Sequence, residues 1–432
     1  MSRELKFETL AAHAGQEDLN DASGSRGIPV YKTTSYLFKN SKHAADLFGL
    51  RELGYIYTRL GDPTADILEK RITAMEGGKS SVAVSSGTNA IFYTIITICE
   101  AGDEIVSANN IYGGTYSQFA AILPKLGINT TFVDAKNPDN FAKAITDKTK
   151  LIFIETISNP SLDFVDIEKA AKIAHDAGIP LVVDATFTTP YLIQTIKYGA
   201  DIVINSLTKW IGGHGSAVGG IITDSGNFNW QSDKFPLFTK PDSNYHGIRW
   251  AYDLPDELKS IAFALRVRTV PLRNLGACLS PDNSWIFIQN AESLALRMDR
   301  HCYNALKTAE FLEKDDRVEW VRYPGLKNDP SYNIASKYLK DKFGGVVVFG
   351  IKGGYDAAVK FIDNIKLFSH LVNVGDVKSL VAHPASTTHS QLSEEELKKA
   401  GISQNFIRLS IGIEHIDDIL YYLDEALTIA NK

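Results

Sequence analysis

Short apolar runs alternate with stretches of helical periodicity between about residue 80 and residue 206. Six runs rich in β-branched and other apolar residues predict strands: "SVAVSS", "EIVSAN", "NTTFV", "LIFIET", "LVVDAT" and "DIVINS". One intervening segment, "DIEKAAKIAHDAG" (166–178), places its apolar residues on one helical face, with Asp166 as N-cap and Gly178 as the stop. Apolar strands that alternate with helices indicate an α/β fold with a mostly parallel sheet covered on both faces.

The segments on either side of this region have a different pattern. Residues 1–62 are loop-rich and predict an N-terminal arm, whereas 63–296 form the predicted large α/β domain. A long helix is predicted at roughly 285–314, and it leads into the runs "VEWVRYPG", "GGVVVFGI" and "NFIRLSIG", separated by helical stretches such as "YDAAVKFIDNI". We therefore expect a smaller α+β domain over 297–432.

Composition excludes several classes of protein. The net charge of −6 gives no electrostatic support for nucleic-acid or membrane-surface binding. The longest apolar run, "AIFYTIITI", is too short to cross a bilayer, and the N-terminus lacks the apolar region of a secretory signal. The three cysteines are far apart, and the ten histidines contain no metal-ligand pair, so we expect a cytoplasmic protein without a metal site.

Two predicted strands end in residues that carry chemistry. "LVVDAT" ends at Asp184, and "DIVINS" leads into "SLTKWIGGHG", which contains Lys209. Taken singly, Asp184 could be a cap or part of a buried ion pair, and Lys209 a solvated turn residue. Because parallel strands end at one edge of a sheet, the two side chains are expected to face one crevice. Their arrangement suits pyridoxal phosphate (PLP), whose aldehyde needs a lysine and whose pyridinium nitrogen needs a carboxylate.

A phosphate group would need a cradle of donors. "VAVSSGTNA" predicts a strand, a tight turn at Gly87 and a helix that starts at Thr88, whose backbone N–H groups could bind phosphate. Ser206 and Thr208 are two residues apart on an extended segment, so their hydroxyls can point the same way. By itself, the turn favours an ordinary strand-to-helix connection.

Four further residues are candidates with structural alternatives. Arg59 could bind phosphate beside Tyr57, or it could be a surface arginine that stacks on that ring. Tyr112, before two glycines, could stack on a pyridine ring or belong to the core. Arg408 lies in an apolar β-rich segment and needs a partner, which could be a structural acid or a substrate carboxylate.

Together these motifs resemble a known family. "YTRLGDPT", "SSGTNA", "YGGTY", "VVDATF", "INSLTKWIGGHG" and "IRLSIGIEHIDDI" are similar to the Cys/Met-metabolism PLP enzymes over nearly the whole chain. The resemblance implies the aspartate-aminotransferase-like fold, PLP fold type I. Within the family, "SDKFPLFTKPDSNYHG", "LRNLGACLSP" and "NVGDVKSLVAHPASTTHSQLSEEE" resemble the O-acetylhomoserine sulfhydrylase subgroup.

The resemblance implies roles for individual residues around the cofactor. Lys209 matches the lysine that forms the Schiff base, Asp184 the partner of the pyridinium nitrogen, and Tyr112 the tyrosine that stacks on the ring. Four positions match the phosphate cradle: Gly87, Thr88, Ser206 and Thr208.

The resemblance also implies a shared site and a substrate site. Tyr57 and Arg59 match a pair that reaches the phosphate of the neighbouring subunit, which implies a homodimer and, by further pairing, a homotetramer. Asn159, Ser379 and Arg408 match the groups that hold the substrate carboxylate.

The chain departs from the family pattern at a few positions. Ala185 stands where the family usually has Asn, Asn205 where it commonly has His, and Thr88 where Met or Gln is frequent. Gly114 replaces the cysteine of methionine γ-lyases, which argues against that activity. Ala185 removes a polar side chain that the family keeps near the cofactor, and we expect any effect to fall on rate or substrate preference.

The implied reaction is γ-replacement on O-acetyl-L-homoserine by sulfide or a thiol, which yields homocysteine or methionine and acetate. Cystathionine γ-synthase or γ-lyase activity uses the same cofactor and is the nearest alternative. A remote alternative is a non-catalytic nucleotide-binding α/β protein that uses "SSGTNA" as a phosphate loop.

Overall fold

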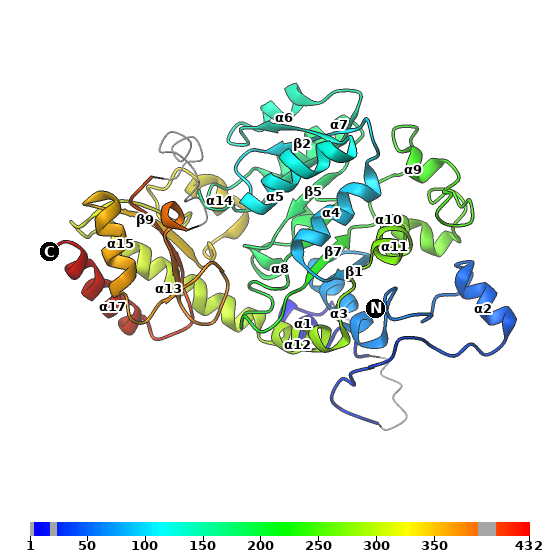
Figure 1. The fold of residues 1–432 in the computed structure, drawn as a ribbon, viewed down its shortest axis with the longest axis horizontal. Coiled ribbons are helices and arrows are strands. Elements are labelled where there is room, and N and C mark those ends of the chain that lie inside the picture. Colours follow the sequence, from blue (N-terminus) through cyan, green and yellow to red (C-terminus); the bar gives the residue numbers. More distant parts are fainter. Residues whose placement is uncertain (1–3, 18–23, 388–402) are drawn as a thin grey trace.

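The computed structural model describes residues 4–17, 24–387 and 403–432, and it contains two sheets side by side along the long axis (Figure 1). The central sheet has seven strands in the order β1-β7-β6-β5-β4-β2-β3, and β7 alone runs antiparallel to its neighbours. Its strands are β1 (Ser80–Val84), β2 (Glu104–Ala108), β3 (Asn129–Val133), β4 (Thr149–Glu155), β5 (Leu181–Asp184), β6 (Ile202–Asn205) and β7 (Gly220–Asp224). The predicted mostly parallel sheet is confirmed.

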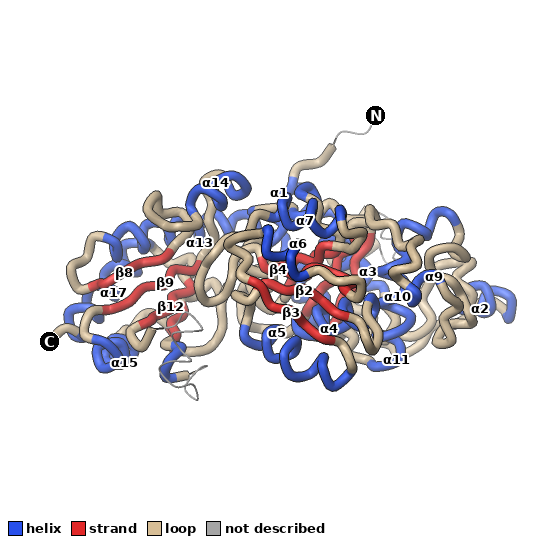
Figure 2. The backbone as a smooth tube through the Cα atoms, turned by 90° about the horizontal axis from the view of Figure 1, so that it is seen from above, coloured by secondary structure: helices blue, strands red, loops and turns tan. Residues whose placement is uncertain are grey.

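Helices cover both faces of this sheet, with α6 and α7 on one side and α4 and α5 on the other (Figure 2). The segment 166–178 folds as predicted: the Asp166 side chain accepts the N–H of Lys169, and the apolar face is buried. The helices of this part are α3 (Pro63–Glu76), α4 (Gly87–Ile98), α5 (Gly113–Ser117), α6 (Asp139–Ala144), α7 (Ile167–Asp176), α8 (Thr189–Leu192), α9 (Pro236–Thr239), α10 (Ala262–Val267), α11 (Arg273–Leu275) and α12 (Pro281–Glu292).

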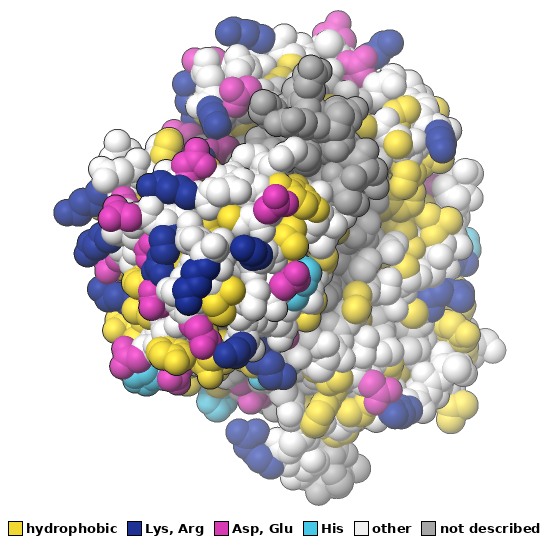
Figure 3. Space-filling model, turned by 60° about the vertical axis from the view of Figure 1, so that its left-hand side comes forward, with side chains coloured by type: hydrophobic (Ala, Val, Ile, Leu, Met, Phe, Trp, Pro, Cys, Tyr) yellow, Lys and Arg dark blue, Asp and Glu magenta, His cyan; other side chains and the backbone are white. Residues whose placement is uncertain are grey.

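The C-terminal part has a second sheet of five strands, ordered β10-β11-β12-β9-β8 and antiparallel except for the β10–β11 pair. Its strands are β8 (Val318–Arg322), β9 (Val346–Ile351), β10 (Ser369–His370), β11 (Leu380–Ala382) and β12 (Phe406–Ser410). Its helices are α13 (Leu294–Glu313), α14 (Tyr332–Leu339), α15 (Gly354–Asn364) and α17 (Ile416–Ala430). On the face shown in Figure 3, positively and negatively charged side chains are interspersed. Within this C-terminal part, Lys366 pairs with Glu425 at 3.2 Å.

The structure differs from the sequence prediction in two places. The single helix predicted at 285–314 is two helices, because the backbone leaves helical geometry at Ser293 (φ −99°, ψ 7°) between α12 and α13. The arm contains two helices, α1 (Phe7–His13) and α2 (Ser41–Phe48); α1 packs on α3 and α12, whereas α2 lies at the far edge of the molecule (Figure 1). The end of the motif "NVGDVKSLVAHPASTTHSQLSEEE" lies outside the described residues.

No helix among the described residues is both long and apolar enough to cross a membrane. The predicted domain limits at 62 and 296 stay predictions.

Candidate active site

The carboxyl ends of β4, β5 and β6 meet at one edge of the central sheet, and a cavity of about 230 Å³ opens there towards the second sheet. Asp184 ends β5, and Lys209 follows β6 in the segment that turns towards β7. Nine of the residues singled out from the sequence line this cavity: Gly87, Thr88, Tyr112, Asn159, Asp184, Ser206, Thr208, Lys209 and Arg408.

The Lys209 amine lies in a mostly buried position within the cavity. Its Nζ donates a hydrogen bond to Oδ1 of Asn373 at 2.5 Å. Burial and the nearby charge of Arg408 lower the pKa of Lys209 to about 8. A lysine with this pKa is partly neutral near physiological pH, which a nucleophile or a base requires.

Arg408 is a buried cation with amide partners. It comes from β12 of the second sheet, and its guanidinium donates to Oδ1 of Asn159 (3.0 Å) and to the backbone oxygen of Asn373 (3.2 Å). No Asp or Glu of the described residues forms an ion pair with it, and burial lowers its pKa to about 10. A buried arginine on a cavity wall without a compensating acid fits an anionic ligand such as a carboxylate.

Two carboxyl groups face the cavity from neighbouring strands. Glu155 and Asp184 are direct partners in the β4–β5 register. Burial raises the pKa of both groups, and repulsion from Asp184 raises that of Glu155 further, so the pair retains a proton above the ordinary range. The backbone N–H of Thr186 donates to Oδ1 of Asp184 at 2.9 Å, which fixes the orientation of that carboxyl group.

The predicted phosphate cradle is assembled from two chain segments. Helix α4 begins at Gly87, and the N–H groups of a first helical turn have no partner within the helix. A Cβ on Gly87 would lie 2.7 Å from Cβ of Ser206, so only glycine allows this close approach. Thr208 is anchored by Gly219, whose N–H donates to its Oγ1 at 3.0 Å. The hydroxyls and the helix N-terminus therefore face one end of the cavity.

The Tyr112 side chain is half exposed at the cavity wall. Its backbone N–H donates to Oε1 of Glu155 at 2.8 Å. A Cβ on Gly114 would lie 2.5 Å from the Tyr112 ring, so the glycine at this position leaves room for the ring against the backbone.

Three of the predicted site residues do not line the cavity. Ser379 is buried elsewhere: its hydroxyl donates to Glu414 (3.0 Å) and accepts the N–H of Gly412 (2.9 Å). Tyr57 and Arg59 lie in the arm, where the guanidinium carbon is 5.0 Å from the centre of the tyrosine ring.

Comparison with known proteins identifies the family of this chain. The sequence profile described as "Cys/Met metabolism PLP-dependent enzyme" matches residues 8–428. The chain belongs to this family. The Cys/Met-metabolism PLP-dependent family predicted from the sequence is thus confirmed, together with its cofactor.

Relatives within the family match over the full length. The chain is 51% identical to the "O-acetyl-L-homoserine sulfhydrylase" of Leptospira meyeri (99% of this chain, 98% of the relative) and 48% identical to the "Homocysteine synthase" of Schizosaccharomyces pombe (98% of each). A solved structure from Campylobacter jejuni, assigned as O-acetylhomoserine (thiol)-lyase with N′-pyridoxyl-lysine-5′-monophosphate, matches with a TM-score of 0.93 and 40% identity, covering 98% and 100% of the two chains. The predicted fold type is confirmed.

The cavity fits the family's cofactor. Its lining includes a lysine, a carboxyl pair and a set of donors, the groups that PLP requires for its aldehyde, ring nitrogen and phosphate. Of the departures from the family pattern, Ala185 is fully buried and does not line the cavity, and Asn205 donates to Oε1 of Glu76 at 2.6 Å. Neither of these side chains contacts the cavity.

The sequence interpretation missed two residues of this site. Asn373 lies in a loop of the second sheet and opens the motif "NVGDVKSLVAHPASTTHSQLSEEE", but the resemblance gave this residue no role. Glu155 closes the run "LIFIET", and a carboxylate at the end of an apolar strand, one strand from Asp184, was a signal that could have been used.

Proposed function

We propose that this chain catalyses PLP-dependent γ-replacement on O-acetyl-L-homoserine, in which sulfide or a thiol displaces acetate and homocysteine or methionine is formed. The names of the relatives support this reaction, and these relatives match nearly the whole chain. The observation in the structure that carries the proposal is Arg408, a buried cation without an acid among the described residues, on the same cavity as Lys209. An amino-acid carboxylate would compensate its charge.

Each residue of the cavity has a role in the proposed reaction that follows from its position. PLP supplies an electron sink for the carbanion at Cα. Lys209 would hold the cofactor through its amine, and the free amine, whose pKa is lowered by burial and by the charge of Arg408, would take the proton from Cα and transfer it further along the substrate chain. Asp184 would keep the ring nitrogen protonated, and Tyr112 would contact the ring.

The substrate is oriented from the second sheet. Arg408 binds the carboxylate, and Asn159 fixes the guanidinium by accepting its Nη1–H. Asn373 contacts both Arg408 and Lys209, so we add it to the predicted substrate site. Ser379 stays a predicted substrate residue; its hydroxyl donates to Glu414 and accepts the N–H of Gly412.

Steady-state assays with O-acetylhomoserine test the reaction. Sulfide and methanethiol should give homocysteine and methionine at higher kcat/KM than cysteine gives cystathionine. Preferred use of cysteine, or turnover of cystathionine alone, would identify a cystathionine γ-synthase or γ-lyase and contradict the proposal. A colourless protein that binds nucleotide would contradict PLP catalysis altogether.

We further propose that the arm completes the cavity of a second subunit in a homodimer, which pairs into a homotetramer. Tyr57 and Arg59 do not line the cavity of their own chain. The arm also exposes apolar side chains, with Leu37 at 99% and Leu53 at 55%, which an isolated chain leaves in water. A cytoplasmic location is proposed as well, because all three cysteines are free.

Mixing of inactive subunits tests the shared site. Arg59→Ala and Lys209→Ala subunits should regain activity after exchange, because one site of the mixed dimer then has neither defect. As a control, Arg408→Met mixed with Lys209→Ala should regain none, since those residues belong to the same cavity. Exchange without recovery in the first mixture would show that the arm serves its own chain.

A further inference from the structure

The loop that carries Asn159 is closed at its base by its own backbone. Ile157 and Phe164 form an isolated antiparallel bridge. Inside it, Ser158 and Asp163 form two hydrogen bonds, both at 3.0 Å: the Ser158 N–H donates to the backbone oxygen of Asp163, and the Asp163 N–H donates to the Ser158 hydroxyl. Asn159 therefore projects from a compact loop whose position depends on what holds its two ends.

Two arginines of the second sheet hold this loop. Arg408 on β12 and Arg322 on β8 are both direct partners of Val348 on the intervening strand β9, so the three residues form one row across the sheet. Directly opposed residues point to the same face of a sheet, and neighbouring strands are about 4.8 Å apart. Arg408 contacts Asn159 at one end of the loop (3.0 Å), and Arg322 contacts Asp163 at the other (3.1 Å).

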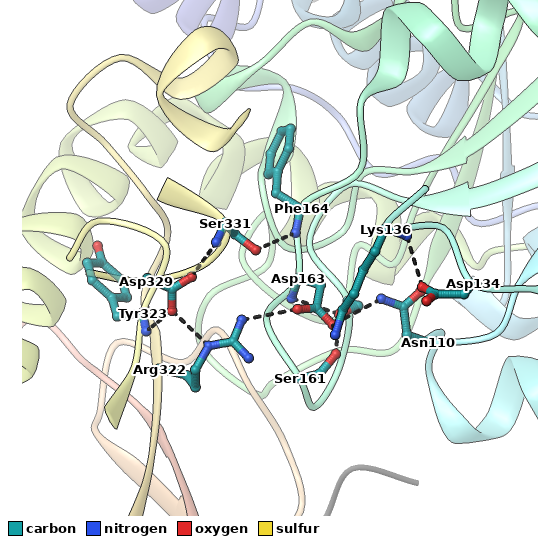
Figure 4. A network of polar contacts seen from close by, with 11 residues as sticks. Asn110, Asp134, Lys136, Ser161, Asp163, Phe164, Arg322, Tyr323, Asp329 and Ser331 are labelled. Carbon is teal, nitrogen blue, oxygen red and sulfur yellow. Dashed lines mark hydrogen bonds and ion pairs between the residues drawn. The ribbon is translucent and has the colours of Figure 1, made fainter. Parts of the chain in front are cut away.

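The Asp163 end of the loop is a buried ion-pair network (Figure 4). Arg322 also donates from Nε to Asp329 at 2.9 Å, and Asp329 accepts the N–H of Ser331, whose hydroxyl accepts the N–H of Phe164. The network thus joins the loop to the second sheet through both an ion pair and a backbone contact.

Asp163 is suited to stay charged in this network. It is 5% exposed, and Asn110 and Lys136 contact its second oxygen at 3.3 and 3.5 Å. Burial opposes ionisation, but hydrogen bonds from Arg322 and Ser161 and the charges of Arg322 and Lys136 outweigh it, so the pKa of Asp163 is lowered. The ion pair with Arg322 therefore persists at neutral pH.

We propose that Arg322 and Asp163 are positioning residues that set the geometry between Asn159 and Arg408, and with it the binding of the substrate carboxylate. This inference rests on the proposed function of Arg408. The network acts as a second attachment of the loop, two strands away from the first in the same row of the sheet. Loss of the ion pair leaves this end of the loop held by the Phe164–Ser331 contact without its charged partner, and the carboxylate site loses its preset geometry.

Asp163→Asn in the PLP-loaded full-length protein tests the proposal. The substitution preserves the shape of the side chain and its contact with Asn110, but it removes the negative charge that pairs with Arg322. The expected result is a rise of about tenfold in KM for O-acetylhomoserine and in Kd for L-homoserine, read from the cofactor absorbance, because a charge-assisted contact is lost. The KM for sulfide and the affinity for PLP should stay unchanged, and kcat should fall less than KM rises.

A matched control separates positioning from stability. Tyr338 makes a different contact between the two parts of the chain: its hydroxyl donates to Asp166 and accepts the N–H of Glu168 at 3.1 Å, at the start of α7. Tyr338→Phe should lower Tm without changing KM. If Asp163→Asn also lowers Tm and leaves KM and Kd unchanged, or lowers PLP affinity equally, the network is structural and the proposal is wrong.

Two more variants, Arg322→Lys and Arg408→Lys, test the proposal independently of Asp163→Asn. If Asp163→Asn does not fold, Arg322→Lys can be used instead. It keeps the positive charge but loses the two-pronged donor geometry of the guanidinium, and it should show the same selective rise in KM. Arg408→Lys is measured in parallel. If it leaves KM unchanged, the proposed function of Arg408 fails and the inference falls with it; if it raises KM while Asp163→Asn and Arg322→Lys do not, only the inference is overturned.

Discussion

Replacement of Arg408 by methionine should leave the folded protein as stable as the wild type or more stable, although it removes a buried arginine. A pKa lowered from 12.5 to about 10 corresponds to about 3 kcal/mol of unfavourable free energy for the charged side chain in the folded state. The substitution also removes two hydrogen bonds, to Asn159 and Asn373, each of which contributes about 1 kcal/mol. Both acceptors line the cavity, where water can replace the guanidinium.

The balance for Arg408→Met is a gain of about 1 kcal/mol, whereas removal of one partner of a buried ion pair usually costs about 3–5 kcal/mol. Arg322 provides the matched control, because it is mostly buried and pairs with Asp163 and Asp329. Arg322→Met should therefore destabilise the protein by about 3 kcal/mol, with the opposite sign to Arg408→Met.

The assay is denaturant-induced unfolding of the wild type and both variants at the same saturation with PLP. The KM for O-acetylhomoserine is measured in parallel, and for Arg408→Met it should rise by roughly 30-fold or more through loss of a charge-assisted pair with substrate. A loss of more than about 2 kcal/mol for Arg408→Met would refute the reasoning, because it would show that the charge is compensated within the protein.

Three further outcomes are expected from the cavity. Gly87→Ala should weaken PLP binding by roughly tenfold, measured by equilibrium dialysis, because the new methyl group displaces Ser206; Thr88→Ala is the control and should have little effect. Glu155→Gln, which has the shape of the protonated acid, should keep kcat within roughly tenfold, whereas Asp184→Asn should lose much more. In the cofactor-free protein, the folded-state pKa of Lys209 (about 8) lies below its ordinary value of 10.5, so its protonation penalty is complete below pH 8. Wild-type stability should therefore rise between about pH 8 and 10.5 relative to Lys209→Met, and a flat difference would contradict the assigned pKa.

The strands and the residues at their ends could be predicted from sequence because each depends on local pattern. The run "NTTFV" coincides with β3, and Asp184 and Lys209 reach one cavity because parallel strands end at one edge. The antiparallel strand β7 was missed, because five residues after a glycine-rich turn carry little periodicity. The order of strands in a sheet also cannot be predicted from local sequence.

Residues placed by the second sheet were harder to predict. Asn373 meets Lys209 across 164 positions of the chain, and only the packing of the two parts brings them together. The resemblance places Ser379 at the substrate carboxylate, and in the structure its hydroxyl donates to Glu414. The motif singles out this segment, whereas the contact of Asn373 with Lys209 depends on how the two parts of the chain pack.

The cavity holds ionisable groups in positions where burial disfavours their charged forms. Burial disfavours the charged forms of Lys209 and Arg408, and it disfavours a double charge on Glu155 and Asp184. A protein selected for stability alone would pair these groups with one another or replace them with apolar residues. Their gathering around one cavity is instead what the proposed function requires, because the acids would face a protonated ring nitrogen and Arg408 a substrate carboxylate. Under that proposal the electrostatic cost is compensated when cofactor and substrate are bound, and a stable fold can retain it.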